Sequence, residues 1–147
     1  MLRTSHVLLC SLLLLPLSAN AQYPGRHPGY DRALADLRYA RALLASGPQW
    51  GPVARDDSRA VAEIDRAIQE VRHAAFDDGR NPNAHPPVDT HWLPPERLRR
   101  AQDLLNKARH DLDREEDNPQ ARGLRDRAWA HIDEAQRAVA HAMSAWR

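Results

Sequence analysis

Apolar residues recur along this chain at spacings of three and four, which is the pattern of an amphipathic helix. Segments rich in Pro, Gly or Asn divide the pattern into four stretches, and we expect helices over about 30–45, 58–77, 95–116 and 121–145. Asp57 or Ser58 should cap the second helix. No stretch shows the strict alternation that a sheet requires. The pattern predicts an all-α fold, an antiparallel four-helix bundle.

A heptad frame assigns an inward-facing row of side chains to each expected helix. The rows are Tyr30, Ala33, Leu37, Ala40 and Leu44; Val61, Ile64, Ile68, Val71 and Ala75; Leu98, Ala101, Leu105, Ala108 and Leu112; and Trp129, Ile132, Gln136, Val139, Met143 and Trp146. Further alanines flank them, so we expect the helices to approach one another closely.

The second half of the chain repeats the first at a constant offset of 68 residues. Positions 33–77 and 101–145 share 14 identities in 45 aligned positions, without a gap. We therefore expect two copies of one αα-hairpin, packed together. The resulting domain covers 30–147, and its parts are hairpin one at 30–79, a proline-rich linker at 80–95, and hairpin two at 96–147.

Two duplicated charges lie at the edges of the apolar faces. Arg41 and Asp65 are equidistant from the centre of the loop in hairpin one, and Arg109 and Asp133 are equidistant from the centre of the loop in hairpin two. Such positions face each other when two helices run antiparallel. The sequence predicts one Arg–Asp ion pair in each hairpin.

The first 21 residues have the features of a cleavable export signal. Arg3 precedes an apolar run, and Ala19-Asn20-Ala21 has the small residues of a cleavage site. Residues 22–29 then form an expected flexible lead-in, since they hold two prolines and two glycines. Cys10 is the only cysteine, so removing 1–21 leaves a chain without disulfides. We expect a periplasmic protein.

Charge and residue inventory narrow the possible functions. Beyond residue 21 the chain has 20 Lys and Arg against 20 Asp and Glu, which argues against nucleic acid or an anionic membrane as the partner. Beyond the signal, no stretch is apolar enough to insert into a bilayer. There is also no nucleophile elbow, phosphate-binding glycine loop or remaining cysteine nucleophile. We expect a protein that is not an enzyme.

Histidines are the strongest candidates for specific chemistry. The heptad frame turns His73, His110, His131 and His141 outward, with charged residues one turn away. Neutral imidazole beside a carboxylate can bind Cu(II), Ni(II) or Zn(II) at a protein surface. Each such pair offers only two ligands, which predicts low affinity. The alternative is that these histidines are solvated polar positions.

A second cluster of potential ligands lies in the linker. His85, Asp89 and His91 are separated by only a few residues, and the prolines between them restrict the backbone. These three side chains could converge on one metal ion. Alternatively, the segment is a rigid spacer whose polar groups have no role in binding.

The signal, the cysteine-free remainder, the repeated alanine-rich helices and the outward histidines together resemble the small periplasmic metal-binding proteins. This resemblance spans most of the exported chain and rests on its pattern. It implies a four-helix bundle that binds copper and other divalent ions. The other hypothesis is a protein-interaction or stress-related scaffold, similar to a chaperone, that binds another periplasmic protein and no metal. Trp50 and Trp92, which we expect to be exposed, would be its contact points.

Overall fold

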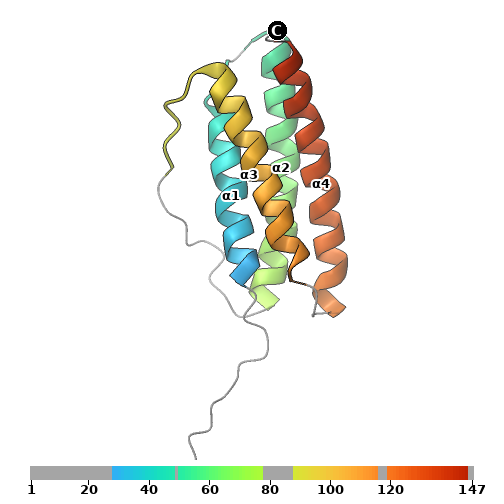
Figure 1. The fold of residues 1–147 in the computed structure, drawn as a ribbon. Coiled ribbons are helices and arrows are strands. Elements are labelled where there is room, and N and C mark those ends of the chain that lie inside the picture. Colours follow the sequence, from blue (N-terminus) through green and yellow to red (C-terminus); the bar gives the residue numbers. More distant parts are fainter. Residues whose placement is uncertain (1–27, 49, 78–87, 116–118, 146–147) are drawn as a thin grey trace, which may run out of the picture.

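The chain folds into four helices packed as a bundle (Figure 1). The computed structural model describes residues 28–48, 50–77, 88–115 and 119–145. The helices are α1 (Pro28–Ala45), α2 (Pro52–Asp77), α3 (Pro94–Asp113) and α4 (Pro119–Ser144). The described residues contain no strand. The prediction of an all-α protein with four helices is confirmed. The expected signal at 1–21 and most of the lead-in lie outside the described residues.

Every helix begins with a proline, because a proline in the first turn sacrifices no intrahelical hydrogen bond. This explains why α2 begins ahead of Asp57 and Ser58. The prediction that one of them caps α2 was wrong, since both lie inside the helix and Ser58 Oγ donates to Ala54 O at 2.7 Å. Gly51, with φ at 89°, takes the left-handed conformation that turns the chain into α2. Pro28 and Gly29, assigned to the lead-in, belong to α1.

Each helix packs against two others. Helices α1 and α4 both pack closely against α2 and α3, whereas no two described residues of α1 and α4, or of α2 and α3, have Cα atoms within 8 Å of each other. In Figure 1 the chain rises in α1, descends in α2 and α3, and rises again in α4. Helix α2 therefore ends at the opposite end of the bundle from the start of α3. The connection between them therefore joins opposite ends of the bundle.

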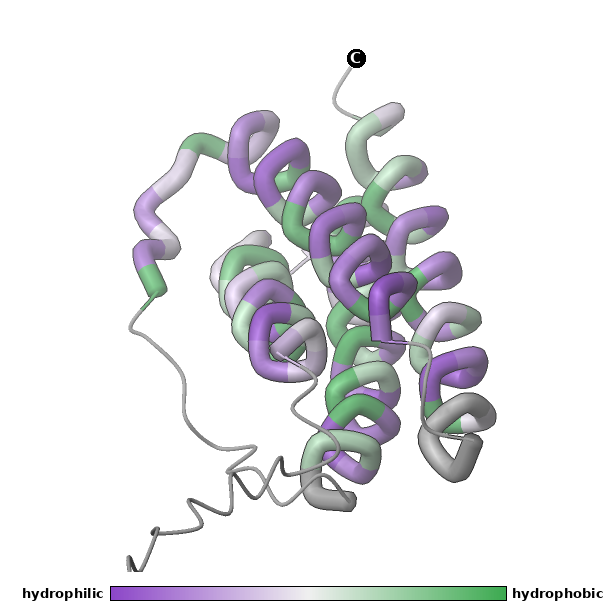
Figure 2. The backbone as a smooth tube through the Cα atoms, turned by 60° about the horizontal axis from the view of Figure 1, so that its bottom comes forward, coloured by the Kyte–Doolittle hydropathy of each residue, from purple (hydrophilic) through white to green (hydrophobic). Residues whose placement is uncertain are grey.

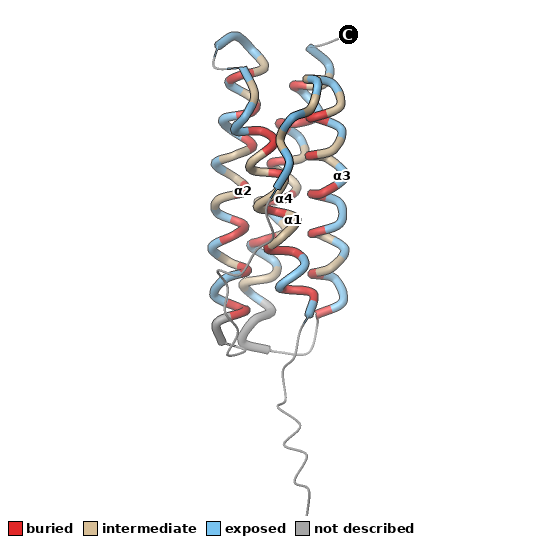
Figure 3. The backbone as a smooth tube through the Cα atoms, turned by 90° about the vertical axis from the view of Figure 1, so that its left-hand side faces the viewer, coloured by how far each residue is buried: buried red, intermediate tan, exposed pale blue. Residues whose placement is uncertain are grey.

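The core consists of the apolar faces of all four helices. Figure 2 shows hydrophobic positions turned towards the interior, and Figure 3 shows buried positions recurring along each helix. The predicted rows of α1 and α3 are fully inside. Helix α4 is rotated relative to its predicted row, since Trp129, Gln136 and Met143 are only partly buried. Its flanking alanines at 128, 135 and 142 are buried instead. None of the described helices is both long and apolar enough to cross a membrane.

The two predicted Arg–Asp ion pairs are confirmed. Arg41 Nε lies 2.5 Å from Asp65 Oδ1, and Arg109 Nε lies 2.9 Å from Asp133 Oδ1. All four side chains are about four-tenths exposed. Solvent screens a pair of this kind, so each stabilises the fold by at most about 1 kcal/mol. They connect facing positions of α1 and α2 and of α3 and α4.

A buried ion pair joins the second half of the chain to the first. Arg97 of α3 binds Asp57 of α2, with 2.8 Å between Nη2 and Oδ2, and the side chains are only 3% and 5% exposed. Arg97 Nη1 also donates to the carbonyl oxygens of Leu43 and Leu44, in the last turn of α1. Burial raises the pKa of the Asp57 carboxyl, and Arg97 opposes this rise. We call this group, together with Gly47 beside it, the Arg97 junction.

Two glycines make room for buried charged side chains. A Cβ on Gly47 would lie 2.8 Å from both Nη atoms of Arg97 and would also collide with Asp57. At the other end of the bundle, Gly29 donates its backbone N–H to Glu115 Oε1 at 2.5 Å. Glu115 is itself buried. Helices α1 and α3 therefore meet at each end through a glycine on one side and a charged residue on the other.

Candidate functional site

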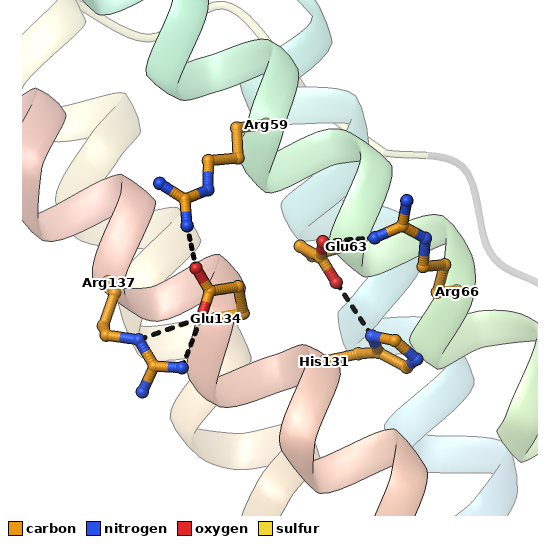
Figure 4. Close-up of polar contacts among 6 residues, drawn as sticks. All are labelled: Arg59, Glu63, Arg66, His131, Glu134 and Arg137. Carbon is orange, nitrogen blue, oxygen red and sulfur yellow. Dashed lines mark hydrogen bonds and ion pairs between the residues drawn. The ribbon is translucent and has the colours of Figure 1, made fainter.

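A ladder of charged side chains and histidines links α2 to α4 on the outside of the bundle (Figure 4). Its acidic members on α2 are Asp56, Glu63 and Glu70, spaced seven residues apart so that they share one face. Its members on α4 are Arg127, His131, Glu134, Arg137 and His141. Arg59 and Arg66 of α2 complete it. We call these ten residues the α2–α4 ladder.

His131 lies at the middle of the ladder and pairs across the helices. Its Nδ1 is 2.8 Å from Glu63 Oε2, and the side chains are 28% and 13% exposed. The second oxygen of Glu63 accepts from Arg66. The sequence placed His131 facing outward with Glu134 one turn away; the ring is partly exposed and pairs with Glu63, whereas Glu134 binds Arg59 and Arg137. The pair His131–Glu63 is thus partly sheltered from water.

His141 forms a second pair nearer the end of α4. Its Nδ1 lies 2.7 Å from Asp56 Oδ2 of α2. The imidazole is 72% exposed, whereas the carboxylate is only 17% exposed. The Nε2 edge of the ring can therefore face water while Nδ1 contacts the carboxylate. Both pairs combine a histidine of α4 with a carboxylate of α2.

The other helical histidines have different surroundings. His73 is exposed on α2, and no described carboxylate is seen to bind it; neighbouring Glu70 accepts from Arg127 Nε at 3.1 Å. His110 lines a shallow depression between α1 and α3, together with Asp36, Lys107 and Asp111. Asp111 itself is bound by Arg32, at 2.9 Å. Neither histidine forms the kind of two-ligand pair seen in the ladder.

Asp36, in the depression beside His110, has a raised carboxyl pKa. Burial is the main cause that raises the pKa of its carboxyl, and the nearby Asp111 adds to it. Lys107 and Arg32 oppose the rise without cancelling it. The folded protein therefore holds the Asp36 proton more tightly than the unfolded chain does.

We expect Asp36→Asn to stabilise the protein at neutral pH. A raised folded pKa means that ionised Asp36 costs stability above that pKa, and that the cost vanishes below the unfolded value. The variant should unfold at a higher urea concentration than the parent at pH 7, and the two should coincide near pH 3. Asp103→Asn, at an exposed position of α3, is the matched control. An Asp36→Asn effect that is the same at both pH values would contradict this assignment.

In the linker, the described residues form a local turn around Asp89. Asp89 Oδ1 accepts the backbone N–H of His91 at 2.9 Å, which is the main cause lowering the pKa of Asp89, and it lies 3.2 Å from His91 Nδ1. His85 lies outside the described residues, so the predicted three-ligand cluster is represented only by Asp89 and His91. Trp92 donates to Asp89 O and stacks under Arg100. It is partly buried, contrary to the expectation that it is exposed.

Of the predicted ligands, the structure brings only Asp89 and His91 together, whereas His131 and His141 each pair with a carboxylate that was not predicted. In the part of the chain that it describes, no three His, Cys, Asp or Glu side chains gather in a way that could hold a metal ion. Sequence reasoning found His131 and His141 but missed their partners, Glu63 and Asp56. The acidic residues at seven-residue intervals on α2 were the available signal.

Comparison with known proteins adds no relative. No family model matches the chain, and no curated protein or solved structure matches it either. The proposals below therefore rest on the side chains of this protein.

Proposed function

We propose that this chain is a non-enzymatic periplasmic bundle protein that binds divalent metal ions weakly, at His131–Glu63 and His141–Asp56. The observation that carries the proposal is the 2.7–2.8 Å separation of imidazole Nδ1 and carboxylate oxygen in both pairs. Two ligand atoms about 2.1 Å from one ion, at a right angle, lie about 3 Å apart. A small opening of either pair would therefore admit an ion.

The donor set fits Cu(II), Ni(II) or Zn(II). Neutral imidazole and carboxylate suit these borderline ions, and water would complete the coordination. Deprotonated ligands are required, so binding would weaken as the pH falls. Two protein ligands per site support a buffering role rather than tight storage. His73 and His110, which form no such pair, would contribute less.

Export is the second part of the proposal. The positively charged start, the apolar run and the small-residue cleavage site within 1–21 support delivery to the periplasm. That compartment is open to changes in external metal concentration, which a low-affinity protein could buffer. The residue inventory noted in the sequence supports a role without catalysis.

We further propose that the bundle consists of two repeated αα-hairpins, with all neighbouring helices antiparallel. The pairs Arg41–Asp65 and Arg109–Asp133 support it, because they coincide at the offset of 68. Glu63 and His131 support it independently: they are separated by that same offset, and they bind each other. Two antiparallel copies related by a twofold axis bring equivalent residues together where the axis passes.

Calorimetric titration of the purified protein tests metal binding. We expect weak binding of Cu(II), Ni(II) or Zn(II) at pH 7.5, weakened about tenfold or more in the double variant His131→Ala/His141→Ala. His73→Ala is the matched control, since it removes an exposed histidine that has no carboxylate partner among the described residues. Glu63→Gln should weaken binding while preserving the size of the side chain. Equal loss in His73→Ala and the double variant would remove the two pairs as the site.

A second function is favoured by two exposed apolar side chains at one end of the bundle. Trp50, between α1 and α2, is 85% exposed, and Leu93, before α3, is 78% exposed. Figure 1 places these two connections at the same end. Such side chains suit a protein-interaction or stress-related scaffold that is similar to a chaperone. Absence of any metal-dependent heat in the titration would favour this function.

A further inference from the structure

The Arg97 junction is a point of recognition between the two hairpins. Arg97 comes from hairpin two, whereas its partners Asp57, Leu43 and Leu44 belong to hairpin one. Both charged side chains are almost completely buried, so each depends on the other for compensation. The junction therefore discriminates between a hairpin that carries Arg97 and one that does not.

The repeat relates the two ends of the bundle to each other. At the offset of 68, Arg97 corresponds to Gly29, Asp57 to Arg125, and Gly47 to Glu115. At one end Gly47, Arg97 and Asp57 meet. At the other end Glu115 binds Gly29, and the equivalent position on α4 is Arg125, whose side chain is only 11% exposed. Each set of three thus contains one glycine, one arginine and one acid.

Pairing of two identical hairpins would lose this balance between arginine and acid. Two copies of hairpin one would put Gly29 in place of Arg97, which would leave Asp57 buried without a cation and with an empty space beside it. Two copies of hairpin two would put Glu115 in place of Gly47 and Arg125 in place of Asp57, so Arg97 would face a second guanidinium group where it now has its carboxylate partner. Uncompensated buried charge opposes both arrangements.

We propose that the inner face of each hairpin binds selectively to the complementary hairpin, and that a second copy of this chain can supply it by reciprocal exchange. Hairpin one of each copy would then pack against hairpin two of the other. This inference rests on the repeat proposed above and is independent of metal binding. The partner is defined by charge: a hairpin with a buried arginine at the position where this one has a buried aspartate.

The connection between the hairpins is long enough for two copies of the chain to exchange them. Residues 78–93 join α2 to α3, and sixteen residues extend to at most about 50 Å. Helix α3 is about 30 Å long. Within one chain, a linker of this length keeps the hairpins at a high effective concentration, so the monomer dominates. Exchange becomes favourable when the pairing within each chain is defective and the pairing between chains is not.

Two full-length variants create that situation. Asp57→Leu leaves Arg97 buried without its partner, and Arg97→Met leaves Asp57 buried without its partner. In a reciprocal pair of the two variants, one bundle regains the native Asp57–Arg97 junction and the other has an apolar junction, which is well tolerated. Exchange between identical variants gives no such gain. The variants are refolded together from urea, with one labelled with ¹⁵N, and analysed by native mass spectrometry and thermal melting.

We expect each variant alone to melt about 10 °C or more below the parent. The mixture should contain dimers with one copy of each variant, well above the statistical proportion, and should melt close to the single-chain double variant Asp57→Leu/Arg97→Met. A mixture that melts as the superposition of its components, without mixed dimers, would overturn the proposal. Single variants that melt like the parent would also overturn it, since the junction would then not discriminate. If neither variant folds alone, recovery on mixing remains the deciding measurement.

Discussion

Replacing Arg97 with alanine will destabilise the bundle by about 3–5 kcal/mol, the usual cost of removing one partner from a buried ion pair. The carboxylate of Asp57 would remain inside the protein without a cation, and the carbonyl groups of Leu43 and Leu44 would lose their donor. Urea unfolding followed by far-ultraviolet circular dichroism measures the loss.

Arg99 provides the control for that experiment. It lies two residues away on α3 and binds Glu96, but both side chains are largely exposed, at 62% and 47%. Arg99→Ala should therefore cost less than about 1 kcal/mol. Similar losses for Arg97→Ala and Arg99→Ala would mean that the junction contributes no more than a surface pair.

Alanine substitution of two helical glycines will have opposite effects on stability. A Cβ on Gly29 would lie 2.5 Å from the backbone oxygen of Asp111 and 2.6 Å from Glu115 Cγ. A backbone atom cannot rotate away, so α1 and α3 would have to separate, at a cost of about 1–3 kcal/mol. Gly123 of α4 is exposed, and the nearest atom to its added Cβ is 3.5 Å away. Gly123→Ala should stabilise the protein by about 1 kcal/mol, through helix propensity alone.

Thermal melting of the two glycine variants measures this difference directly. Gly29→Ala should melt below the parent and Gly123→Ala above it. An increase in melting temperature for both variants would contradict the close approach of α1 and α3 at Gly29.

The four helices could be predicted from the sequence because their apolar periodicity is a local property. The Arg41–Asp65 pair could be predicted as well, since a short loop brings consecutive helices together and determines which positions face each other. The start of α2 could not, because Asp57 and Ser58 are residue types that commonly cap helices. In the folded protein Asp57 instead serves as the partner of Arg97.

For the pairs between α2 and α4, the sequence offered the acidic residues at seven-residue intervals on α2 but not their partners on α4. The pairs depend on which helices are neighbours after the linker has crossed the bundle, and the linker composition does not determine that. Arginine is also normally a surface residue, so nothing local distinguished the buried Arg97 from the exposed Arg99. The glycines that make room for Arg97 and Glu115 lie far from them in sequence, and their role depends on the packing of α1 against α3.

The pairing of Glu63 with His131 has a consequence for the history of the chain. A dimer of identical hairpins has the same residue at both equivalent positions, so it could place only glutamate against glutamate, or histidine against histidine, on its axis. If the two halves descend from one ancestral hairpin, a mixed pair at this place became accessible only after they were joined in a single gene. A symmetric assembly forces like against like on its axis, and fusion would thus have opened this position to selection for new chemistry.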